Sequence, residues 1–430
     1  MKDKCFISHN VFTGVLSYNP EKSGTISYVQ WDANSGFYLH NEFHNYIRSL
    51  KNSGVNAWRV LPWYYEPIDI QEGRIKPEQF FVPHRYEGNG RWNLTQFNNN
   101  YFDVLSQIIS ICIETGDAGS DGAVFMLPII DNTAEHANYG PWISNSQGIT
   151  SVYDKNAEQY IRLLMDTIFA KLAHIPKDRL YFETGNEIVG NRAIDLCMQL
   201  LIPKLLEKGV PFTQISLGIN ANINKNDPNG NNLQELRDRV RGEWGRGRLR
   251  ETFWPIHGCL RKNGGAFGQP TTWAVRGDPP QGHWVNLKPH GLSYPIRLIF
   301  SDDGTGDGNS SCDIHPNPSA QYRTRPSVDQ WREFFSWMLE NSYMVRDDGF
   351  PMYWFEHWMK ITSLNCQKAY FEMFNQEYRK YFGGDLANYG KYPGEGPKTL
   401  EQRVTELEIR VAKLEEIIHA TASRTSKRKK

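Results

Sequence analysis

The chain has 430 residues, of which 39% are hydrophobic and 13% aromatic, enough for a large buried core in one large domain or in two or three small ones. Its 48 basic and 48 acidic side chains balance, so the whole chain has no general attraction for nucleic acid or anionic membranes. The sequence contains neither a secretory signal nor a run long enough to span a membrane, and its six cysteines are too widely spread for a disulfide framework or a zinc site. We therefore expect a soluble, cytoplasmic or virion-associated protein with reduced cysteines.

Eight short apolar segments are predicted to contain β-strands, and helical spacing of apolar residues separates most of them. The strand segments are residues 10–17, 55–61, 123–130, 179–187, 214–219, 255–259, 296–301 and 352–355. The predicted helices are residues 37–50, 101–115, 153–172, 192–206, 328–339 and 364–381, and residues 66–99 are expected to form a long loop. This alternation predicts an α/β fold, a (β/α)8 TIM barrel over residues 1–390.

The fourth strand segment carries two carboxylates and an amide into one short turn. It reads Arg-Leu-Tyr-Phe-Glu-Thr-Gly-Asn-Glu, with Glu183 inside the strand. Gly185 interrupts the side-chain alternation, so Asn186 and Glu187 can face the same pocket. A carboxyl group held by an amide beside a second carboxylate is the arrangement that raises a pKa until the group donates a proton near neutrality. The alternative is structural, with Asn186 as a helix N-cap and Glu187 in the first turn.

Polar and aromatic residues stand at or near the ends of several other predicted strands, where a barrel of this kind builds its active site. With those of the fourth segment, the candidates are Arg59, Trp63, Trp142, Asn186, Glu187, His257, Asp302, Trp354, Glu356 and Trp358. Flat tryptophan rings suit stacking on sugars, but packing in the core is an equally good interpretation of each. For His257, a structural hydrogen-bonding role is as consistent as a site role.

No metal site and no cofactor are predicted. Residues 302–308 are similar to a calcium loop, but they lack the bidentate Glu and the full alternation of an EF-hand. Asp131 and His136 do not have the spacing of a helical metal pair, and the chain has no phosphate-binding loop.

The chain changes character after residue 390. Residues 391–399 have the composition of a linker, and residues 400–420 place apolar residues at alternating spacings of four and three, typical of a coiled coil. Residues 403–408 and 410–415 resemble the Arg-h-x-x-h-Glu motif of trimeric coiled coils, so self-association as a trimer is favoured over a dimer. The alternative is an amphipathic helix folded back on the barrel. Residues 421–430 are expected to be a solvated basic tail.

Two of these segments resemble the clan A glycoside hydrolases, in particular the cellulase and mannanase family. Glu183-Thr-Gly-Asn186-Glu187 resembles the family's Glu-x-x-Asn-Glu signature on the fourth strand. The resemblance implies that Glu187 is the general acid/base and that Asn186 contacts the sugar 2-hydroxyl. Residues 54–62 are similar to the family's second strand, which implies that Arg59 orients the nucleophile. His257 corresponds to the family's sixth-strand His.

The seventh strand departs from the family, because Asp302 stands where the family has a nucleophilic Glu. Aspartate is shorter by one methylene, about 1.5 Å, so both retention and inversion stay open. Glu356 is the alternative second carboxylate. The predicted function is a glycosidase that cleaves a polysaccharide or oligosaccharide by two-carboxylate chemistry, with Glu187, Asp302 and Glu356 as catalytic candidates. The alternative is an oligomeric glycan-binding or structural barrel without turnover, in a virus or phage particle.

Overall fold

The computed structural model describes residues 5–12, 28–61, 76–114, 123–130, 140–186, 188, 191–217, 235–236, 238–245, 254–258, 296–301, 353–358, 372 and 376. In strands β1, β10, β11 and β12 the description covers the backbone and its register. The predicted helix at 328–339, the linker 391–399, the coiled coil 400–420 and the tail 421–430 lie outside the described residues. In the described part of the chain, no helix is both long and apolar enough to cross a membrane.

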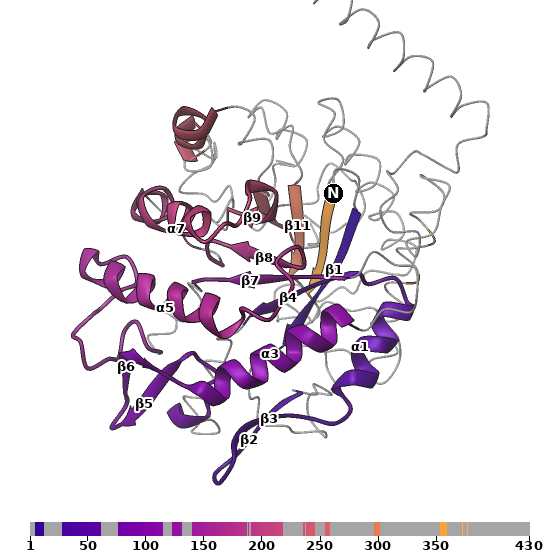
Figure 1. The fold of residues 1–430 in the computed structure, drawn as a ribbon, viewed down its shortest axis with the longest axis horizontal. Coiled ribbons are helices and arrows are strands. Elements are labelled where there is room, and N and C mark those ends of the chain that lie inside the picture. Colours follow the sequence, from indigo (N-terminus) through magenta and orange to yellow (C-terminus); the bar gives the residue numbers. More distant parts are fainter. Residues whose placement is uncertain are drawn as a thin grey trace, which may run out of the picture.

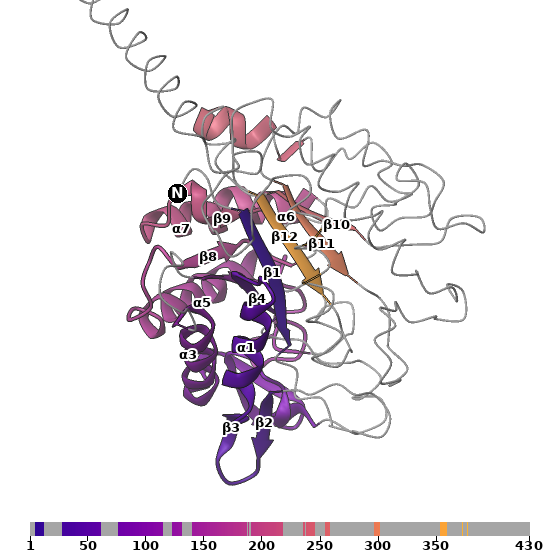
Figure 2. The same cartoon turned by 90° about the vertical axis from the view of Figure 1, so that its right-hand side faces the viewer.

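The centre of the fold is one parallel eight-stranded sheet (Figure 1). Its strands in chain order are β1 (Cys5–Phe12), β4 (Ala57–Leu61), β7 (Val124–Pro128), β8 (Leu180–Glu183), β9 (Ile215–Ser216), β10 (Trp254–Gly258), β11 (Ile296–Ser301) and β12 (Tyr353–Trp358). In space the order is β10-β11-β12-β1-β4-β7-β8-β9, so strands that are consecutive in the chain lie side by side, except β9 and β10, and β12 lies beside β1. Figure 2 shows β11, β12 and β1 running side by side.

The α/β class and the parallel sheet are therefore confirmed, whereas a closed barrel is not seen. Within the described residues, β9 and β10 are the two edges of the sheet. Within the predicted strand at 214–219, Gln214 ends the 3-10 helix η4 (Phe212–Gln214) and β9 is Ile215–Ser216, while residues 218–219 lie outside the described residues. The predicted eighth strand is longer than expected, and Glu356 lies inside β12 rather than after it.

Helices cover the outer face of the sheet. They are α1 (Phe43–Asn52), α3 (Asn99–Glu114), α5 (Glu158–Lys171), α6 (Asn191–Leu196), the π-helix η3 (Cys197–Leu201) and α7 (Ile202–Glu207), with the 3-10 turns η1 (Pro77–Gln79) and η2 (Lys155–Ala157). The predicted helix at 192–206 is thus one helical stretch with a π-helical turn. The next helix, α7, has Pro203 as its second residue, and proline has no N–H to donate to the preceding turn.

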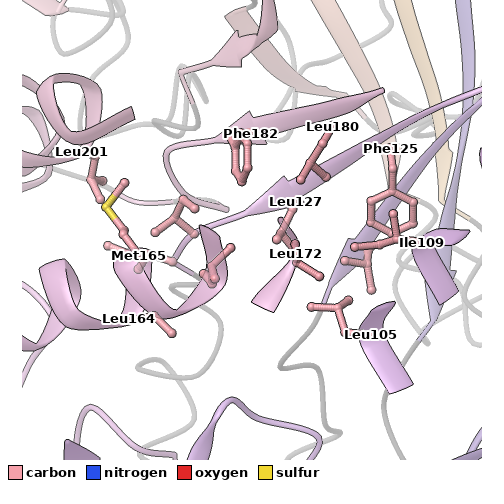
Figure 3. Close-up of a cluster of buried hydrophobic side chains, with 14 of the residues drawn as sticks. Leu105, Ile109, Phe125, Leu127, Leu164, Met165, Leu172, Leu180, Phe182 and Leu201 are labelled. Atoms are coloured by element: carbon pink, nitrogen blue, oxygen red, sulfur yellow. The ribbon is translucent and has the colours of Figure 1, made fainter. Parts of the chain in front are cut away.

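The outer face of β7 and β8 forms the main apolar core. Phe125 and Leu127 on β7 and Phe182 on β8 project toward α3 and α5, as Figure 3 shows. Helix α5 buries Ile161, Leu164, Met165 and Ile168, a helical spacing that forms one continuous apolar stripe. Each such side chain contributes about 1.5–3 kcal/mol when it is fully buried.

The inner face of the same strands is separate from this core. Ala57, Val124, Met126 and Tyr181 form a second buried cluster on β4, β7 and β8. Since successive side chains in a strand point to opposite faces, Arg59 and Glu183 share the inner face with this cluster.

Two antiparallel hairpins occupy stretches that were expected to be helix or loop. The first is β2 (Val29–Asp32) with β3 (Gly36–Leu39), which takes the start of the predicted helix 37–50. Its turn is closed by the Asp32 carboxylate, which accepts the backbone N–H groups of Asn34 and Ser35. The second is β5 (His84–Gly88) with β6 (Arg91–Phe97), inside the predicted loop 66–99. Its turn is Asn89-Gly90, with positive φ at both residues, a strong hairpin signal.

The two hairpins and residues 140–150 join into one layer on the carboxyl side of the sheet. Each hairpin stands directly before a helix that follows a sheet strand (Figure 1). The Asn100 side chain of α3 bonds both backbone groups of Phe37, at 2.5 and 2.8 Å. On β6, Trp92 exchanges backbone hydrogen bonds with Ser144 and Ser146. The described parts of the connections after β1, β4 and β7 are therefore joined by hydrogen bonds.

Candidate active site

The described residues bring together one buried ion pair and one amide at the carboxyl ends of β4 and β8. Arg59 Nε donates to Glu183 Oε2 at 2.8 Å, and Arg59 Nη2 lies 2.7 Å from the same oxygen. Nη2 also donates to Asn186 Oδ1 at 2.6 Å. The exposed fractions are 1% for Arg59, 0% for Glu183 and 5% for Asn186, so this network is sealed from bulk solvent.

The backbone fixes this network from both strands. Arg59 pairs in register with Met126 on β7, and Met126 pairs with Tyr181 on β8. Glu183 is two residues beyond Tyr181, so it has the same facing and lies closer to the carboxyl end. The residues after β7 also hold the turn that follows β8, because the Asn186 N–H donates to the Ile130 carbonyl at 2.7 Å.

Gly185 allows this turn to pass close to its neighbours. A Cβ atom at this position would lie 2.7 Å from Ile188 Cγ2 and 3.3 Å from the Ile130 carbonyl oxygen. Ile188 is fully buried, so it has little room to move away. The glycine expected to break the side-chain alternation therefore has a packing reason as well.

The adjacent residue ties the strand end to the helix that follows. The Thr184 N–H donates to the Ser216 carbonyl at 2.9 Å, which links β8 to β9. Burial raises the pKa of the Cys197 thiol to about 12, and a side-chain hydrogen bond joins that thiol to Thr184. A thiol with such a pKa stays protonated and acts as a structural partner rather than as a nucleophile.

The network determines how the Asn186 side chain is oriented. An asparagine amide has one acceptor oxygen and one NH2 donor group, and the guanidinium occupies the oxygen. Arg59, in turn, is held to one carboxylate oxygen by a hydrogen bond from Nε and an ion-pair contact from Nη2. A buried network of this type fixes the orientation of the Asn186 amide.

Of the predicted site residues, the structure brings Arg59 and Asn186 together. The resemblance had assigned Arg59 to the nucleophile, and the partner that the described residues give it is Glu183. Glu187, Asp302 and Trp63 lie outside the described residues. His257 lies in β10, and Trp354, Glu356 and Trp358 lie in β12. For these four residues the structure describes the backbone.

Trp142 requires a correction. It is 1% exposed and contacts His84 of β5 edge-on, with ring centroids 5.2 Å apart and planes at 82°. A ring enclosed in this way has no free face for a sugar, so Trp142 belongs to the core beneath the β5–β6 hairpin. The sequence could not distinguish this because the hairpin that covers it was expected to be a loop.

A cavity of about 260 Å³ lies elsewhere, between the ends of α5 and α7. It is lined by Leu180 and Phe182 from the outer face of β8, so it is on the opposite side of the sheet from Arg59. Among the described residues, no three His, Cys, Asp or Glu side chains gather where they could bind a metal ion.

Comparison with known proteins does not assign a family. No protein-family model matches the chain, and no curated protein matches it. Among solved structures it is similar to an endoglucanase, with 11% identity and a TM-score of 0.40 over 76% of this chain and 89% of that one. A beta-glucosidase from Thermotoga maritima shares 13% identity, with a TM-score of 0.38 over 74% and 76% of the two chains. A further structure described as a glycoside hydrolase shares 11%, with a TM-score of 0.41 over 84% and 88%.

Similarity at this level is too weak to carry an argument about function. The architecture rests instead on the strand order and register of this chain.

Proposed function

We propose that the protein is a glycoside hydrolase that cleaves a polysaccharide or oligosaccharide, with Glu187 as the acid that protonates the leaving oxygen. The observation that carries this proposal is the buried Arg59–Glu183–Asn186 network, which ends one residue before Glu187. Two-carboxylate glycosidases need one protonated and one ionised carboxyl group across the scissile bond. A rigid amide beside the acid supplies the orientation that such a reaction requires.

Asn186 is proposed to bind the hydroxyl next to the reacting carbon. Its amide oxygen accepts a hydrogen bond from Arg59, and its NH2 group is the donor proposed to reach the substrate hydroxyl. Because the network is already formed, little reorganisation is needed when charge develops in the transition state.

The second carboxylate is proposed to come from Asp302 or from Glu356. Asp302 directly follows Ser301, the last residue of β11, where it would attack the sugar or activate a water molecule. A separation of about 5–5.5 Å between the two carboxyl groups gives retention, and about 6.5–9.5 Å gives inversion. Trp63, His257, Trp354 and Trp358 are the proposed substrate-binding residues that accompany them.

The proposed architecture closes the sheet into a (β/α)8 barrel within residues 1–390. The strand order supports this, because it runs through the chain order without an interruption other than the β9 and β10 edges. Residues 400–420 are proposed to assemble three copies. Several sites on one assembly would strengthen binding to a repeating polysaccharide through effective concentration.

The test is hydrolysis of a panel of β-glucans, mannans and bacterial capsular polysaccharides by wild type and by Glu187→Gln. We expect wild-type turnover, and a loss of about 10²–10⁴-fold in kcat in the variant, the usual contribution of a general acid. Glu78→Gln is the matched control, because Glu78 is an exposed glutamate in η1. Equal turnover by wild type and Glu187→Gln would exclude Glu187 as the acid.

A second candidate function is glycan binding without turnover. Asp302, in the place of a longer nucleophile, is the feature that favours it. Binding of a glycan by both wild type and Glu187→Gln, with no hydrolysis by either, would support this alternative over the enzyme.

A further inference from the structure

The cavity between the ends of α5 and α7 lies at the amino ends of β8 and β9. Leu180 is the first residue of β8, and Gln214 directly precedes β9. The other walls are the end of α5 with the residues that follow it, and the residues that follow α7. Figure 3 shows Leu180 and Phe182 projecting from β8 on the side of Leu172. The cavity is therefore at the opposite end of β8 from Glu183.

The interior of this cavity is apolar. Five buried side chains that line it keep exposed fractions between 2% and 7%: Leu172, Ile175, Leu180, Phe182 and Val210. By contrast, Leu164 and Met165 in the middle of α5 are 0% exposed. Phe169 stands against Phe182 with ring centroids 4.9 Å apart. Because protein interiors are normally close-packed, a solvent-reached apolar space of this size is a candidate ligand site.

Polar groups in the walls are already hydrogen-bonded within the protein. Gln214 Nε2 donates to the carbonyls of Lys177 and Leu180 at 2.7 and 3.3 Å, which uses both N–H bonds of its amide. The backbone N–H groups of Gly209 and Val210 donate to carbonyls of α7. These groups have no donor left for a ligand. The interior therefore favours an apolar ligand group, since a polar one would lose its hydrogen bonds to water without replacement.

The charged groups that line the cavity are both basic, Lys177 and Lys208. Lys208 Nζ lies 2.5 Å from Asp166 Oδ1, so its charge is already paired. Lys177 is exposed and forms no ion pair with the described residues, and the neighbouring Asp178 is paired with Arg179 at 3.6 Å. Since Lys177 both lines the cavity and reaches solvent, its ammonium group lies where the cavity opens. An unpaired positive charge beside an apolar space complements a ligand with an apolar body and an anionic head.

We propose that this cavity binds a free medium-chain carboxylate, with the hydrocarbon chain inside and the carboxylate at Lys177. An apolar cavity of about 150 Å³ binds benzene, so a volume of about 260 Å³ corresponds to about ten carbon atoms. This volume admits one short chain rather than the two chains of a membrane lipid. The site lies on the outer face of the sheet, so the proposal is independent of the proposed glycosidase function.

The first test is calorimetric titration of the full-length protein with saturated carboxylates, each below its critical micelle concentration. Decanoate should bind at one site per chain. From hexanoate to decanoate the affinity should rise about fourfold per methylene, the gain from burying each CH2 group. From decanoate to tetradecanoate it should rise much less, because the cavity is then full.

Two outcomes of this titration would overturn the proposal. One is the absence of decanoate binding, as when another part of the chain or a second copy occupies the cavity. The other is an undiminished gain per methylene up to tetradecanoate, which would indicate adsorption on an open surface.

The second test places the chain inside the cavity. Ala173 lines the cavity but is exposed, so Ala173→Phe adds a ring there without overpacking the core. We expect this variant to lose decanoate binding. Ala170→Phe is the matched control, because Ala170 is exposed on α5 outside the cavity, and it should bind as wild type does. Equal binding by Ala173→Phe and wild type would overturn the proposal.

The third test places the carboxylate, and it does not depend on the folding of Ala173→Phe. Lys177→Gln should weaken decanoate binding by about two- to fivefold, the range of an exposed ion pair, and should leave decanol binding unchanged. Lys155→Gln, at an exposed lysine away from the cavity, should change neither affinity. The same effect of Lys177→Gln on decanoate and on decanol would overturn the assignment of the head group.

Discussion

The two faces of β7 and β8 are buried by opposite means. The outer face is closed by apolar side chains of α3 and α5, among them Leu164 and Ile168 (Figure 3). The inner face, near the carboxyl ends, is closed by a charged pair, Arg59 and Glu183. Apolar packing adds stability for each group buried, whereas a buried ion pair roughly breaks even and becomes costly when one partner is lost. The outer face therefore contributes most of the stability, whereas the ion pair of the inner face fixes the orientation of its side chains.

The largest expected effect comes from breaking the ion pair. Glu183→Gln leaves the Arg59 guanidinium buried without its carboxylate, and we expect a loss of about 3–5 kcal/mol in the free energy of unfolding. Chemical denaturation of the two proteins measures it. A loss below about 0.5 kcal/mol, the range of surface substitutions, would show that the pair does not hold the inner face.

The outer face should respond to lost volume instead. Leu164 is fully buried, so Leu164→Ala is expected to cost about 2–5 kcal/mol through lost transfer energy and a residual cavity. The neighbouring Leu163 is 38% exposed, and Leu163→Ala serves as the matched control with a change within about 0.5 kcal/mol. If both substitutions had the same effect, the packing of α5 on the sheet would be incorrect. Thermal and chemical unfolding both report this difference.

A smaller effect is expected at Gly185, in the turn directly after β8. Gly185→Ala places a Cβ against the buried Ile188, and such overpacking costs about 1–3 kcal/mol. Gly242→Ala is the control, because a Cβ there meets no atom within 4 Å. Chemical unfolding of the Gly185→Ala and Gly242→Ala variants measures the difference. A neutral Gly185→Ala would mean that the turn before Asn186 is looser than the structure has it.

The smallest effect on the free energy of unfolding near neutral pH is expected from His84, a titratable side chain that is buried in its neutral form. Burial lowers the pKa of His84 to about 3, so the folded state keeps the ring neutral. The unfolded chain binds a proton at the ordinary pKa near 6.5, so stability is complete above that pH and falls as the pH decreases toward 3. The slope is about 1.4 kcal/mol per pH unit.

His84→Leu should remove this part of the pH dependence. His44 is exposed, so His44→Leu should leave it unchanged. Unfolding free energies measured between pH 7 and pH 5 test both variants. An identical pH dependence in wild type and His84→Leu would show that His84 has the same pKa in the folded and the unfolded state, and would contradict its burial without charge.

The sequence predicted the central strands well and the connections poorly. Residues 55–61, 123–130 and 179–187 are dense apolar runs, and β4, β7 and β8 lie inside them. β1 begins at Cys5, but the prediction began at residue 10. The start of the strand was missed because the polar Ser8, His9 and Asn10 interrupt its apolar pattern. The hairpin β5–β6 was expected to be a loop, although its Asn89-Gly90 turn is a local hairpin signal.

The candidate site was predictable by residue type but not by pairing. Arg59 and Asn186 were among the candidates, since charge and amide groups at strand ends mark a pocket. Glu183 was noted only as a carboxylate inside the strand, and its role as the partner of Arg59 was missed. Arg59 and Glu183 are 124 residues apart in the chain, and their contact depends on the stagger of two strands, which no local pattern specifies. The burial of Trp142 likewise depends on a hairpin from another part of the chain.

The most direct test of the central claim is the separation between the Glu187 carboxyl group and its nearest acidic partner, measured in a crystal structure. The account predicts Asp302 or Glu356 as that partner, within about 5–10 Å, with both groups open to a groove wide enough for a saccharide. A Glu187 side chain enclosed in a dry interior, or with every acidic group farther than about 10 Å, would contradict it.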